Sequence, residues 1–414
     1  MHDLARIRRR APAVMKRRRV KITGIGFVTP AGIGREEFLL KIQEPVSRVG
    51  TIKRFPEGAG AFVGAEVKGF KLERYVRGSN SRRMARHTQF ALAAAQLAVS
   101  DAGYSFSALR NRGALVMIGA TLMDFGAINK SIDLALEEGP LSANPTSVVS
   151  SMVSGISAAV GEVIGGPTRT VGLQTACCSG LDSIGQAYEM IARGEADIAI
   201  CGGTEAPLHF HPMVEFRMLG LAPGNPEHPE RQCRPFDLWR TTGVIGEGAC
   251  VVVLESEEAP AAPYAYVSGY SYASDSPGNS CDGLLAAMRA AASNAGLRAG
   301  EIESVSAWGP GHKALDAAET RAMQEFFGSQ LAELPVASLK GAIGNPLGAA
   351  GAIQVGCAAL GLRCSFIPPT VNWAHPDPAC PLNLSSRTRY VTHKNAMINA
   401  HGLTANNSCL LLSK

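Results

Sequence analysis

The sequence predicts an α/β protein built from two similar halves. Short apolar segments alternate with segments of helical periodicity along the chain, and the whole alternation occurs twice. Glycine and alanine are abundant, 46% of the residues are hydrophobic and only 6% are aromatic, which is typical of a tightly packed enzyme rather than a disordered or fibrous chain. We therefore expect parallel strands covered by helices, with the loops at the carboxyl ends of strands from both halves meeting in one cleft.

Each half is predicted from its own series of elements. The N-terminal half is expected over residues 20–258 and the C-terminal half over residues 259–414, because Glu and Pro cluster near residues 256–263. Residues 20–34 are predicted to be a strand that runs into a Gly/Pro loop, and further strands are predicted at 114–119, 197–203, 246–255, 264–272, 305–308, 335–339, 396–400 and 409–412. Helices are predicted at 81–103, 147–165, 181–194, 281–296 and 317–327, and from residue 352 onward.

Positive charge is concentrated in the first nineteen residues. They contain eight Lys or Arg and one Asp, or +7, which leaves the rest of a chain of net charge +5 at about −2. Such a segment could contact nucleic acid or anionic lipid, could be a transit peptide, although it lacks the serine of one, or could precede a true start at Met15. We favour a disordered or artefactual tail over residues 1–19, and we expect no nucleic-acid partner.

Several functional classes are disfavoured. No apolar run is expected to reach bilayer-spanning length, and the N-terminus has no apolar signal region. The ten cysteines include no Cys-x-x-Cys pair, so neither a metal site nor another cofactor is predicted. Most of the cysteines stand in apolar segments, as expected for reduced thiols in a cytoplasmic protein. The Gly-x-Gly at residues 24–26 lacks the third glycine and the acidic residue of a dinucleotide-binding motif.

The stretch Val171–Gly194 combines a strand end, a tight turn and a helix. A predicted strand ends near Leu173, Thr175–Gly180 is a turn of small residues, and apolar residues then recur at helical spacing. A cysteine at such a turn lies near backbone N–H groups and the positive end of a helix dipole, which would lower its pKa and activate the thiolate. Cys177 is therefore a candidate nucleophile. The alternative is that Cys177 and Cys178 are small, buried core residues.

Six segments occur in a characteristic order along the chain. They are VKITGIGFVTPAG, TACCSG, DIAICGGTEA, RPFD with GEGACVVVLE, SLKGAIGNPLGAAGA and NAHGLTANNSCLLL. In these segments, from about Val20 to the C-terminus, the chain resembles the β-ketoacyl-acyl-carrier-protein synthases of the thiolase superfamily, the condensing enzymes of fatty acid and polyketide synthesis. The resemblance implies a thiolase-like fold, with two similar βαβαβ halves packed as α/β/α/β/α layers. It also implies an acyl carrier protein as partner, and a homodimer or a heterodimer with another ketosynthase.

The resemblance implies that Cys177 accepts the acyl group and that both catalytic histidines of the family are replaced. Trp308 stands where the strand-end motif A-H-G-T has its histidine, and Asn345 stands at the histidine of G-H-x-x-G-A-A-G. In the family these histidines donate to the thioester carbonyl and stabilise the enolate formed when malonyl-carrier loses CO₂. Loss of one preorganised donor costs about 3 kcal/mol, so decarboxylative condensation is expected to be weakened or absent.

Three charged positions of the family are retained. Lys340 matches the family lysine that precedes the second histidine, and we expect it to contribute to substrate binding. Asp316 and Glu319 match the acidic pair that follows the first histidine, and ion pairing there is expected to hold the loops together. Their retention indicates a selected fold more than intact chemistry.

The C-terminal gate loop, residues 401–407, departs from the family motif F-G-F-G-G-T-N and reads HGLTANN. Leu403 replaces the swinging phenylalanine and, with Thr404, is expected to contact the substrate. His401 replaces the other phenylalanine, whose position implies a place beside the nucleophile, so His401 could act as a base toward Cys177. The alternative is a histidine bonded to the backbone and uninvolved. Other histidines that could be catalytic are His312, His209 and His211.

Three functions remain open from the sequence. The chain could be an acyltransferase that takes an acyl group from an acyl-carrier-protein or coenzyme A thioester onto Cys177. It could be a non-catalytic partner of an active ketosynthase, like the chain-length factors, or a condensing enzyme that uses Trp308 and Asn345 as donors. We favour the acyltransferase because Cys177 is retained and His401 is new. The segment 147–165 and the strand before Cys177 are expected to form a large apolar dimer interface.

Overall fold

The computed structural model describes residues 17–53, 55, 60–79, 81, 84–224, 227–278 and 281–414. Of the tail expected over residues 1–19, residues 1–16 lie outside the described residues. Its last three residues are ordered against the body. They form three ion pairs, Arg17 with Glu189 at 2.7 Å, Arg18 with Asp197 at 2.6 Å and Arg19 with Glu257 at 2.6 Å.

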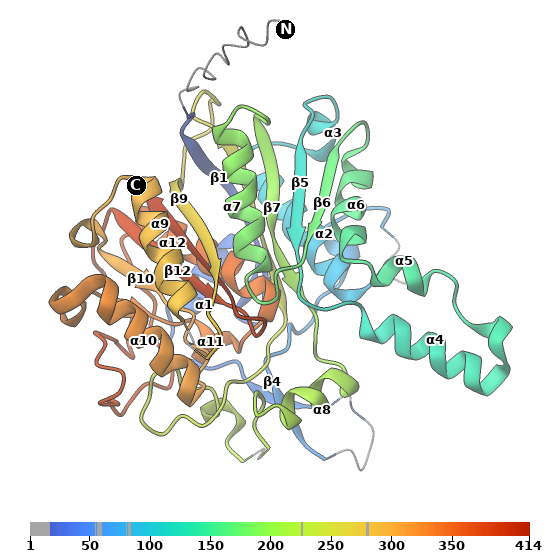
Figure 1. The fold of residues 1–414 in the computed structure, drawn as a ribbon. Coiled ribbons are helices and arrows are strands. Elements are labelled where there is room, and N and C mark those ends of the chain that lie inside the picture. Colours follow the sequence, from blue (N-terminus) through green and yellow to red (C-terminus); the bar gives the residue numbers. More distant parts are fainter. Residues whose placement is uncertain are drawn as a thin grey trace, which may run out of the picture.

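A mixed sheet of eleven strands runs through the described part of the chain (Figure 1). Its strand order is β11-β10-β12-β13-β9-β1-β8-β7-β5-β6, with β2 (Gly32–Ile33) paired to β1 alone. The N-terminal half contributes β1 (Val20–Thr29), β8 (Gly248–Ser256), β7 (Ile198–Glu205), β5 (Leu115–Gly119) and β6 (Arg169–Leu173). The C-terminal half contributes β9 (Ala265–Ser274), β13 (Asn406–Ser413), β12 (Asn395–His401), β10 (Ser304–Ser306) and β11 (Val336–Ala337).

The two halves repeat the same strand directions around the junction of β1 and β9. In the N-terminal half the first strand, β1, pairs antiparallel with the last, β8, and β8 pairs antiparallel with β7. In the C-terminal half the first strand, β9, pairs antiparallel with the last, β13, and β13 pairs antiparallel with β12. The outer strands are parallel in both, as β7-β5-β6 and as β12-β10-β11. Residues 20–22 pair with residues 265–267 and join the halves into one sheet.

Helices complete a layered arrangement. The central helices α7 (Ser179–Ala192) and α12 (Ala350–Cys364) pack against each other and against strands of both halves. On the outer faces, α2 (Arg86–Asp101) and α6 (Val153–Ile164) cover the N-terminal half, while α9 (Asp282–Ala295) covers the C-terminal half with α10 (Lys313–Phe327) packed on it. This α/β/α/β/α order confirms the predicted thiolase-like fold.

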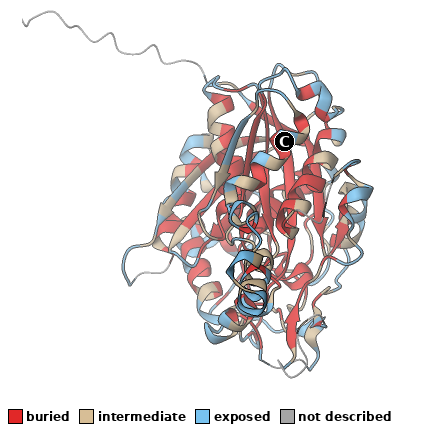
Figure 2. Ribbon diagram, turned by 90° about the vertical axis from the view of Figure 1, so that its right-hand side faces the viewer, coloured by how far each residue is buried: buried red, intermediate tan, exposed pale blue. Residues whose placement is uncertain are grey.

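The central helix α12 is largely apolar, with Gln354 as its one buried polar side chain. The run Leu347–Cys364 is long and apolar enough to cross a bilayer by length and composition, which corrects the expectation that no run of this length exists. However, 83% of this run is buried inside the protein, and Figure 2 shows the interior elements as continuously buried. A helix enclosed between the two halves of the sheet is largely apolar because most of its residues contact the core.

The contact of α7 with β7 and with the start of α12 requires glycine. A Cβ on Gly180 would lie 2.4 Å from the Gly348 carbonyl oxygen, and one on Gly203 would lie 2.5 Å from the same atom. Both distances are well inside van der Waals contact. The glycines of the TACCSG, CGGTE and GAAG segments therefore set how deeply the helix that follows Cys177 is placed between the halves.

The remaining elements connect this framework. They are α1 (Arg35–Ile42), α3 (Phe106–Leu109), α4 (Phe125–Glu138), α5 (Ser147–Ser151), α8 (Phe210–Met218), α11 (Lys340–Ile343) and the pair β3 (Gly50–Ile52) and β4 (Phe62–Gly64). The helix predicted at 147–165 is in fact two, because Met152 is extended, with φ −73° and ψ 130°. The helix predicted from residue 81 begins at Arg86, and residues 82 and 83 lie outside the described residues. In Figure 1, α4 and α5 project from the body as an arm.

Candidate active site

Cys177 lies in the predicted turn between β6 and α7. Ala176, the residue before it, has a left-handed φ of 52°, which is strained for a residue with a side chain. The Ser179 hydroxyl holds this turn, because it accepts the Thr175 N–H at 2.9 Å and donates to the Ala176 carbonyl at 2.5 Å. Cys177 itself is only 2% exposed. The neighbouring Cys178 is also buried, and its Sγ donates to the Asn406 carbonyl at 3.4 Å.

Cys177, Trp308, Asn345 and Leu403 line one cavity, although they come from four distant parts of the sequence. The cavity has a volume of about 20 Å³, and most of its remaining lining is apolar. A space of this size holds about one water molecule, so an acyl chain enters only if the lining moves. Leu403 is half exposed and is the side chain of the gate loop that faces this cavity.

Trp308 lines this cavity and carries a hydrogen-bond donor that is not used within the described residues. Its backbone N–H and that of Gly309 each donate to Glu319 at 2.8 Å, which fixes the loop after β10. The indole ring is 3% exposed, and its Nε1–H has no hydrogen-bond partner among the described residues. The ring of His401 packs edge-on against it, with ring centroids 5.5 Å apart.

Asn345 is held by its backbone. Its N–H donates to the Val244 carbonyl at 2.7 Å, and its carbonyl accepts the Gly246 N–H at 2.9 Å. The side chain is 6% exposed, and within the described residues its Oδ1 is a buried acceptor without a donor. Asn345 and Trp308 therefore place an unpaired acceptor and an unpaired donor around the same cavity as Cys177.

His401, at the end of β12, is held in one tautomer by a chain of hydrogen bonds. The Asn407 Nδ2 donates to Asp275 Oδ1 at 2.8 Å and to the Ala405 carbonyl at 3.1 Å, so the Asn407 Oδ1 faces the His401 Nδ1, 2.6 Å away. The Nδ1 of the neutral ring therefore carries the proton, and Nε2 carries a lone pair. The Asp275 carboxylate lies 3.9 Å from Nδ1. His401 therefore bonds to a side chain rather than to the backbone, and it is absent from the lining of the Cys177 cavity.

The environment raises the pKa of the Cys177 thiol to about 12. Burial is the largest cause and the nearby Glu205 carboxylate is the next. The Leu403 backbone N–H and the Lys340 charge act in the opposite direction. This corrects the expectation of a lowered thiol pKa, because the loss of hydration outweighs the helix N-terminus. A proton acceptor is therefore needed before Cys177 can attack a carbonyl.

Two expected substrate-binding residues lie outside the cavity lining. Lys340 is fully buried behind Trp308, with Nζ 3.0 Å from Gln354 Oε1 and 5.9 Å from the centroid of the indole ring. Burial lowers the pKa of its ammonium group to about 8. Thr404 is exposed, and its hydroxyl accepts a hydrogen bond from Asn406. Of the three residues expected to bind substrate, only Leu403 lines the cavity.

Sequence reasoning missed two acidic residues that shape the site. Glu205 accepts backbone N–H groups from Thr121, Leu122 and Gly348, and its burial raises the pKa of its carboxyl to about 7. It stands in the quoted segment DIAICGGTEA, where its acidity in a buried strand was a usable signal. Asp275 gave no such signal, because it is 126 positions from His401 and precedes no recognised motif.

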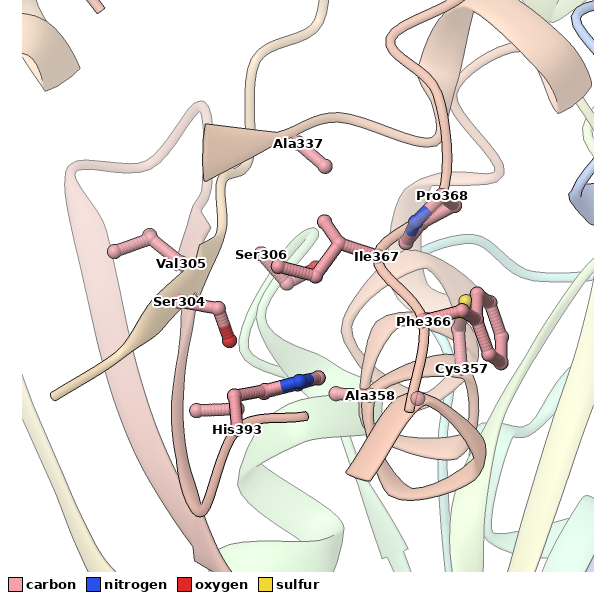
Figure 3. Close-up of a pocket in the computed structure, with 12 residues that line it drawn as sticks. Ser304, Val305, Ser306, Ala337, Cys357, Ala358, Phe366, Ile367, Pro368 and His393 are labelled. Atoms are coloured by element: carbon pink, nitrogen blue, oxygen red, sulfur yellow. The ribbon is translucent and has the colours of Figure 1, made fainter. Parts of the chain in front are cut away.

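The other three candidate histidines differ in whether they lie near Cys177. His312 lines the Cys177 cavity, whereas His209 and His211 lie at the start of α8 and are absent from that lining. A further small cavity, of about 30 Å³, lies between β10, α12 and the segment around Ile367 (Figure 3). His393 lies at its edge, but its lining is almost wholly apolar and does not include Cys177.

Comparison with known proteins places the chain in a family. The family model for the β-ketoacyl synthase N-terminal domain matches residues 17–259, and that for the C-terminal domain matches residues 264–374. The chain is 31% identical over 416 residues to 3-oxoacyl-[acyl-carrier-protein] synthase 2 of Coxiella burnetii, covering 97% of this chain and 99% of that protein.

Solved structures give the same result. The ishigamide ketosynthase/chain length factor matches with a TM-score of 0.90 and 31% identity, over 96% of this chain and 99% of that one. A type II polyketide ketosynthase, bound to the hexaketide and in complex with its acyl carrier protein, matches with a TM-score of 0.86 and 27% identity over the same shares. The chain therefore belongs to the β-ketoacyl synthase family, the ketosynthase-type transferases of fatty acid and polyketide synthesis.

Proposed function

We propose that the chain is an acyltransferase of the ketosynthase family. It takes an acyl group from an acyl-carrier-protein or coenzyme A thioester onto Cys177, in fatty acid or polyketide-type biosynthesis. The observation that carries this proposal is the cavity that Cys177 shares with Trp308 and Asn345, where neither family position supplies an imidazole. The related ketosynthase that is in complex with its acyl carrier protein supports the choice of carrier.

His401 is the proposed base for acylation. Its Nε2 lone pair takes the thiol proton, and the Asn407 carbonyl with the nearby Asp275 carboxylate stabilises the imidazolium that forms. The Cys177 sulfur then bonds to the thioester carbon. The backbone N–H groups of Cys177 and Leu403, which lower the thiol pKa, hold the oxyanion. Collapse expels the carrier thiolate, which takes the proton back from His401.

Decarboxylation is expected to be weak because it needs different groups. Loss of CO₂ from a malonyl thioester builds negative charge on the thioester oxygen, away from the sulfur of Cys177. Trp308 offers one indole N–H there and Asn345 a neutral amide, and both are poorer donors than the two imidazoles that they replace. Each missing donor costs about 3 kcal/mol. Acyl transfer is therefore proposed to continue while condensation is weakened or absent.

Intact-mass spectrometry after exposure to acyl-carrier thioesters of different chain length tests the proposal. The unmodified protein should gain the mass of one acyl group, Cys177→Ala should gain none, and His401→Ala should be acylated roughly 100-fold more slowly. Cys178→Ala is the matched control, because this neighbouring buried thiol does not line the cavity. Absence of any acyl adduct on the unmodified protein would refute the proposed function.

A second candidate function is a condensing enzyme with a Cys-Trp-Asn site, which the buried and unpaired Trp308 Nε1–H favours. The indole could donate to the malonyl thioester oxygen in place of an imidazole. Release of ¹⁴CO₂ from carboxyl-labelled malonyl-carrier separates the candidates. Slow or absent release supports acyl transfer alone, and rapid release establishes condensation. The double variant Trp308→His and Asn345→His is expected to raise the release, unless the cavity left by the indole disturbs the site.

A further inference from the structure

His312 combines a capping role with a place in the Cys177 cavity. It stands immediately before α10, and its Nδ1 accepts the Leu315 backbone N–H at 3.4 Å, as an N-cap side chain does. Its carbonyl accepts the Asp316 N–H at 2.9 Å, and the preceding Gly311 N–H donates to the Asp316 carboxylate at 3.1 Å. The backbone at His312 is therefore held on both sides, the ring is held by its bond at Nδ1, and the residue lines the cavity.

The capping bond decides which nitrogen of His312 carries the proton. Because Nδ1 accepts a backbone N–H, the neutral ring must carry its hydrogen on Nε2. Burial, together with the charge of Arg240, lowers the pKa of His312, which keeps the ring neutral near pH 7. The imidazole thus offers the cavity a donor. It cannot accept a proton at Nε2 in this tautomer, so it is not a base toward Cys177.

His312 lies toward the open end of the cavity. Cys177, Trp308 and Asn345 are 6% exposed or less, whereas His312 is partly exposed and Leu403 is half exposed. A thioester whose carbonyl carbon reaches Cys177 must pass the partly exposed residues. Apart from the indole N–H and the Asn345 amide, the cavity lining carries few polar side chains, so an additional fixed donor is placed where substrate carbonyls pass.

We propose that His312 contacts the substrate and donates its Nε2–H to a carbonyl oxygen of the bound acyl thioester. This rests on the proposed function and extends it. His401 and His312 are held in opposite tautomers, so the first accepts the thiol proton and the second donates to oxygen. The carbonyl is either that of the thioester itself or an amide carbonyl of the arm that carries it.

Variants can separate the donor from the cap. His312→Ser keeps an oxygen that can cap α10 but removes the donor, whereas His312→Asn keeps the cap and restores an N–H on a shorter side chain. A net hydrogen bond of this kind corresponds to about a threefold to tenfold change in affinity. In a Cys177→Ala background, His312→Ser should weaken calorimetric binding of a hexanoyl-N-acetylcysteamine thioester by that factor. His312→Asn should recover part of it, and all should melt at similar temperatures.

The choice of thioester identifies the carbonyl. If the Cys177-containing His312→Ser variant has a raised KM for acylation by both S-ethyl hexanethioate and hexanoyl-N-acetylcysteamine, the bond is to the thioester carbonyl. If only the second is affected, the bond is to the amide of the arm. Equal binding by the Cys177→Ala protein with and without His312→Ser, for both compounds, overturns the proposal. The binding assay uses the Cys177→Ala protein and needs no acylation. Failure of the proposed function is therefore recognised separately, by the absence of an acyl adduct on the unmodified protein.

Discussion

At the scale of the residue, Cys177 is a protonated thiol that depends on its neighbours. Its hydration is lost, Glu205 lies close by, and the only compensation is from backbone N–H groups and the buried Lys340. A nucleophile of this kind stays unreactive toward bulk reagents until a bound substrate and a base assemble around it. Its reactivity is therefore a property of the complex more than of the free protein.

Alkylation of Cys177 by iodoacetamide is expected to rise with pH without a plateau from pH 7 to 10. The thiolate fraction increases about tenfold per pH unit as long as the pH is below the pKa, which burial raises to about 12. The rate is measured by mass spectrometry of the peptide that contains Cys177. Exposed Cys364 serves as an internal reference for the reagent. A plateau below pH 8 would mean that the thiol is activated in the free protein.

His87 makes a second residue-scale contribution, to stability. Its Nδ1 accepts the Thr88 N–H at 2.8 Å, its Nε2 is buried with no partner among the described residues, and burial lowers its pKa to about 4. Between pH 6.5 and 4 the unfolded chain therefore binds a proton that the folded chain does not. Stability must fall as the pH falls through this window, by at most about 3 kcal/mol from this group.

Replacement of His87 is expected to remove the loss of folding stability that its protonation causes below pH 6.5. Burial raises the pKa of Glu205 and Asp316 to about 7, and these groups act in the opposite direction, so the test uses differences between proteins. The free energy of unfolding of His87→Phe, minus that of the unmodified protein, should grow by up to about 3 kcal/mol from pH 7 to pH 4. His87→Gln should give the same pH dependence from a different baseline. Denaturation curves that stay parallel across this range would contradict the assignment.

At the scale of the element, the crossing of β7, α7 and the start of α12 sets the depth of the nucleophile. Gly203→Ala would put a Cβ 2.5 Å from the Gly348 carbonyl, so it should destabilise the protein by about 1–3 kcal/mol and slow acylation of Cys177. Denaturant melts and intact-mass kinetics measure the two effects. The control is Gly50→Ala, at a position with no atom within 4 Å of the added Cβ. Equal stability of the two variants would show that the crossing can relax.

Much of this architecture could be predicted from local sequence. The alternation of strands and helices gave both halves, because a buried parallel strand and an amphipathic helix each leave a periodic pattern. The break at Met152 could not be predicted, since it lies within a continuous run of small and apolar residues. The resemblance correctly placed Trp308, Asn345 and Leu403 around the same cavity as Cys177, whereas Thr404 is exposed and does not line it.

The thiol pKa and the histidine tautomers of the site could not be predicted from the sequence, because they depend on contacts between distant segments. A local motif reports the helix dipole acting on Cys177, but the thiol pKa depends on burial and on Glu205, which comes from another strand. The tautomer of His401 likewise depends on Asp275, through Asn407. The tautomer of His312 depends on a backbone N–H three residues later, and only the observed cap reveals it.

At the scale of the whole molecule, one face remains uncovered. β6 is one of the two edge strands of the large sheet, and its residues 169–171 are exposed. Large apolar side chains are exposed on the adjoining arm of α4, α5 and the segment between them. They are Ile132, Leu136, Leu141, Val148, Val149 and Met152. An unpaired strand edge beside an apolar arm is the pattern of an interface, so we expect this face to be covered by a second copy or by another ketosynthase.

Sedimentation at micromolar concentration tests this assembly. The protein is expected to be a dimer, alone or with a partner ketosynthase. The double variant Leu136→Asp and Val149→Asp should shift it toward monomer, because it would bury two charges in an apolar contact. Leu40→Asp, at an equally exposed leucine on α1, is the control and should leave the assembly unchanged. A monomer under both conditions would refute the expected interface.

The seam between the halves also has a consequence for synthesis. Cys177 belongs to the half that leaves the ribosome first, whereas Trp308, Asn345 and His401 all belong to the half that follows. At 5–20 residues per second, residues 264–414 take about 8 to 30 seconds to be translated. During that interval the nascent chain carries Cys177 without Trp308, Asn345, His401 or the loop of residues 401–407. The high pKa of the Cys177 thiol depends partly on burial by the C-terminal half. The nascent chain is therefore the form in which Cys177 is most accessible to oxidation and alkylation.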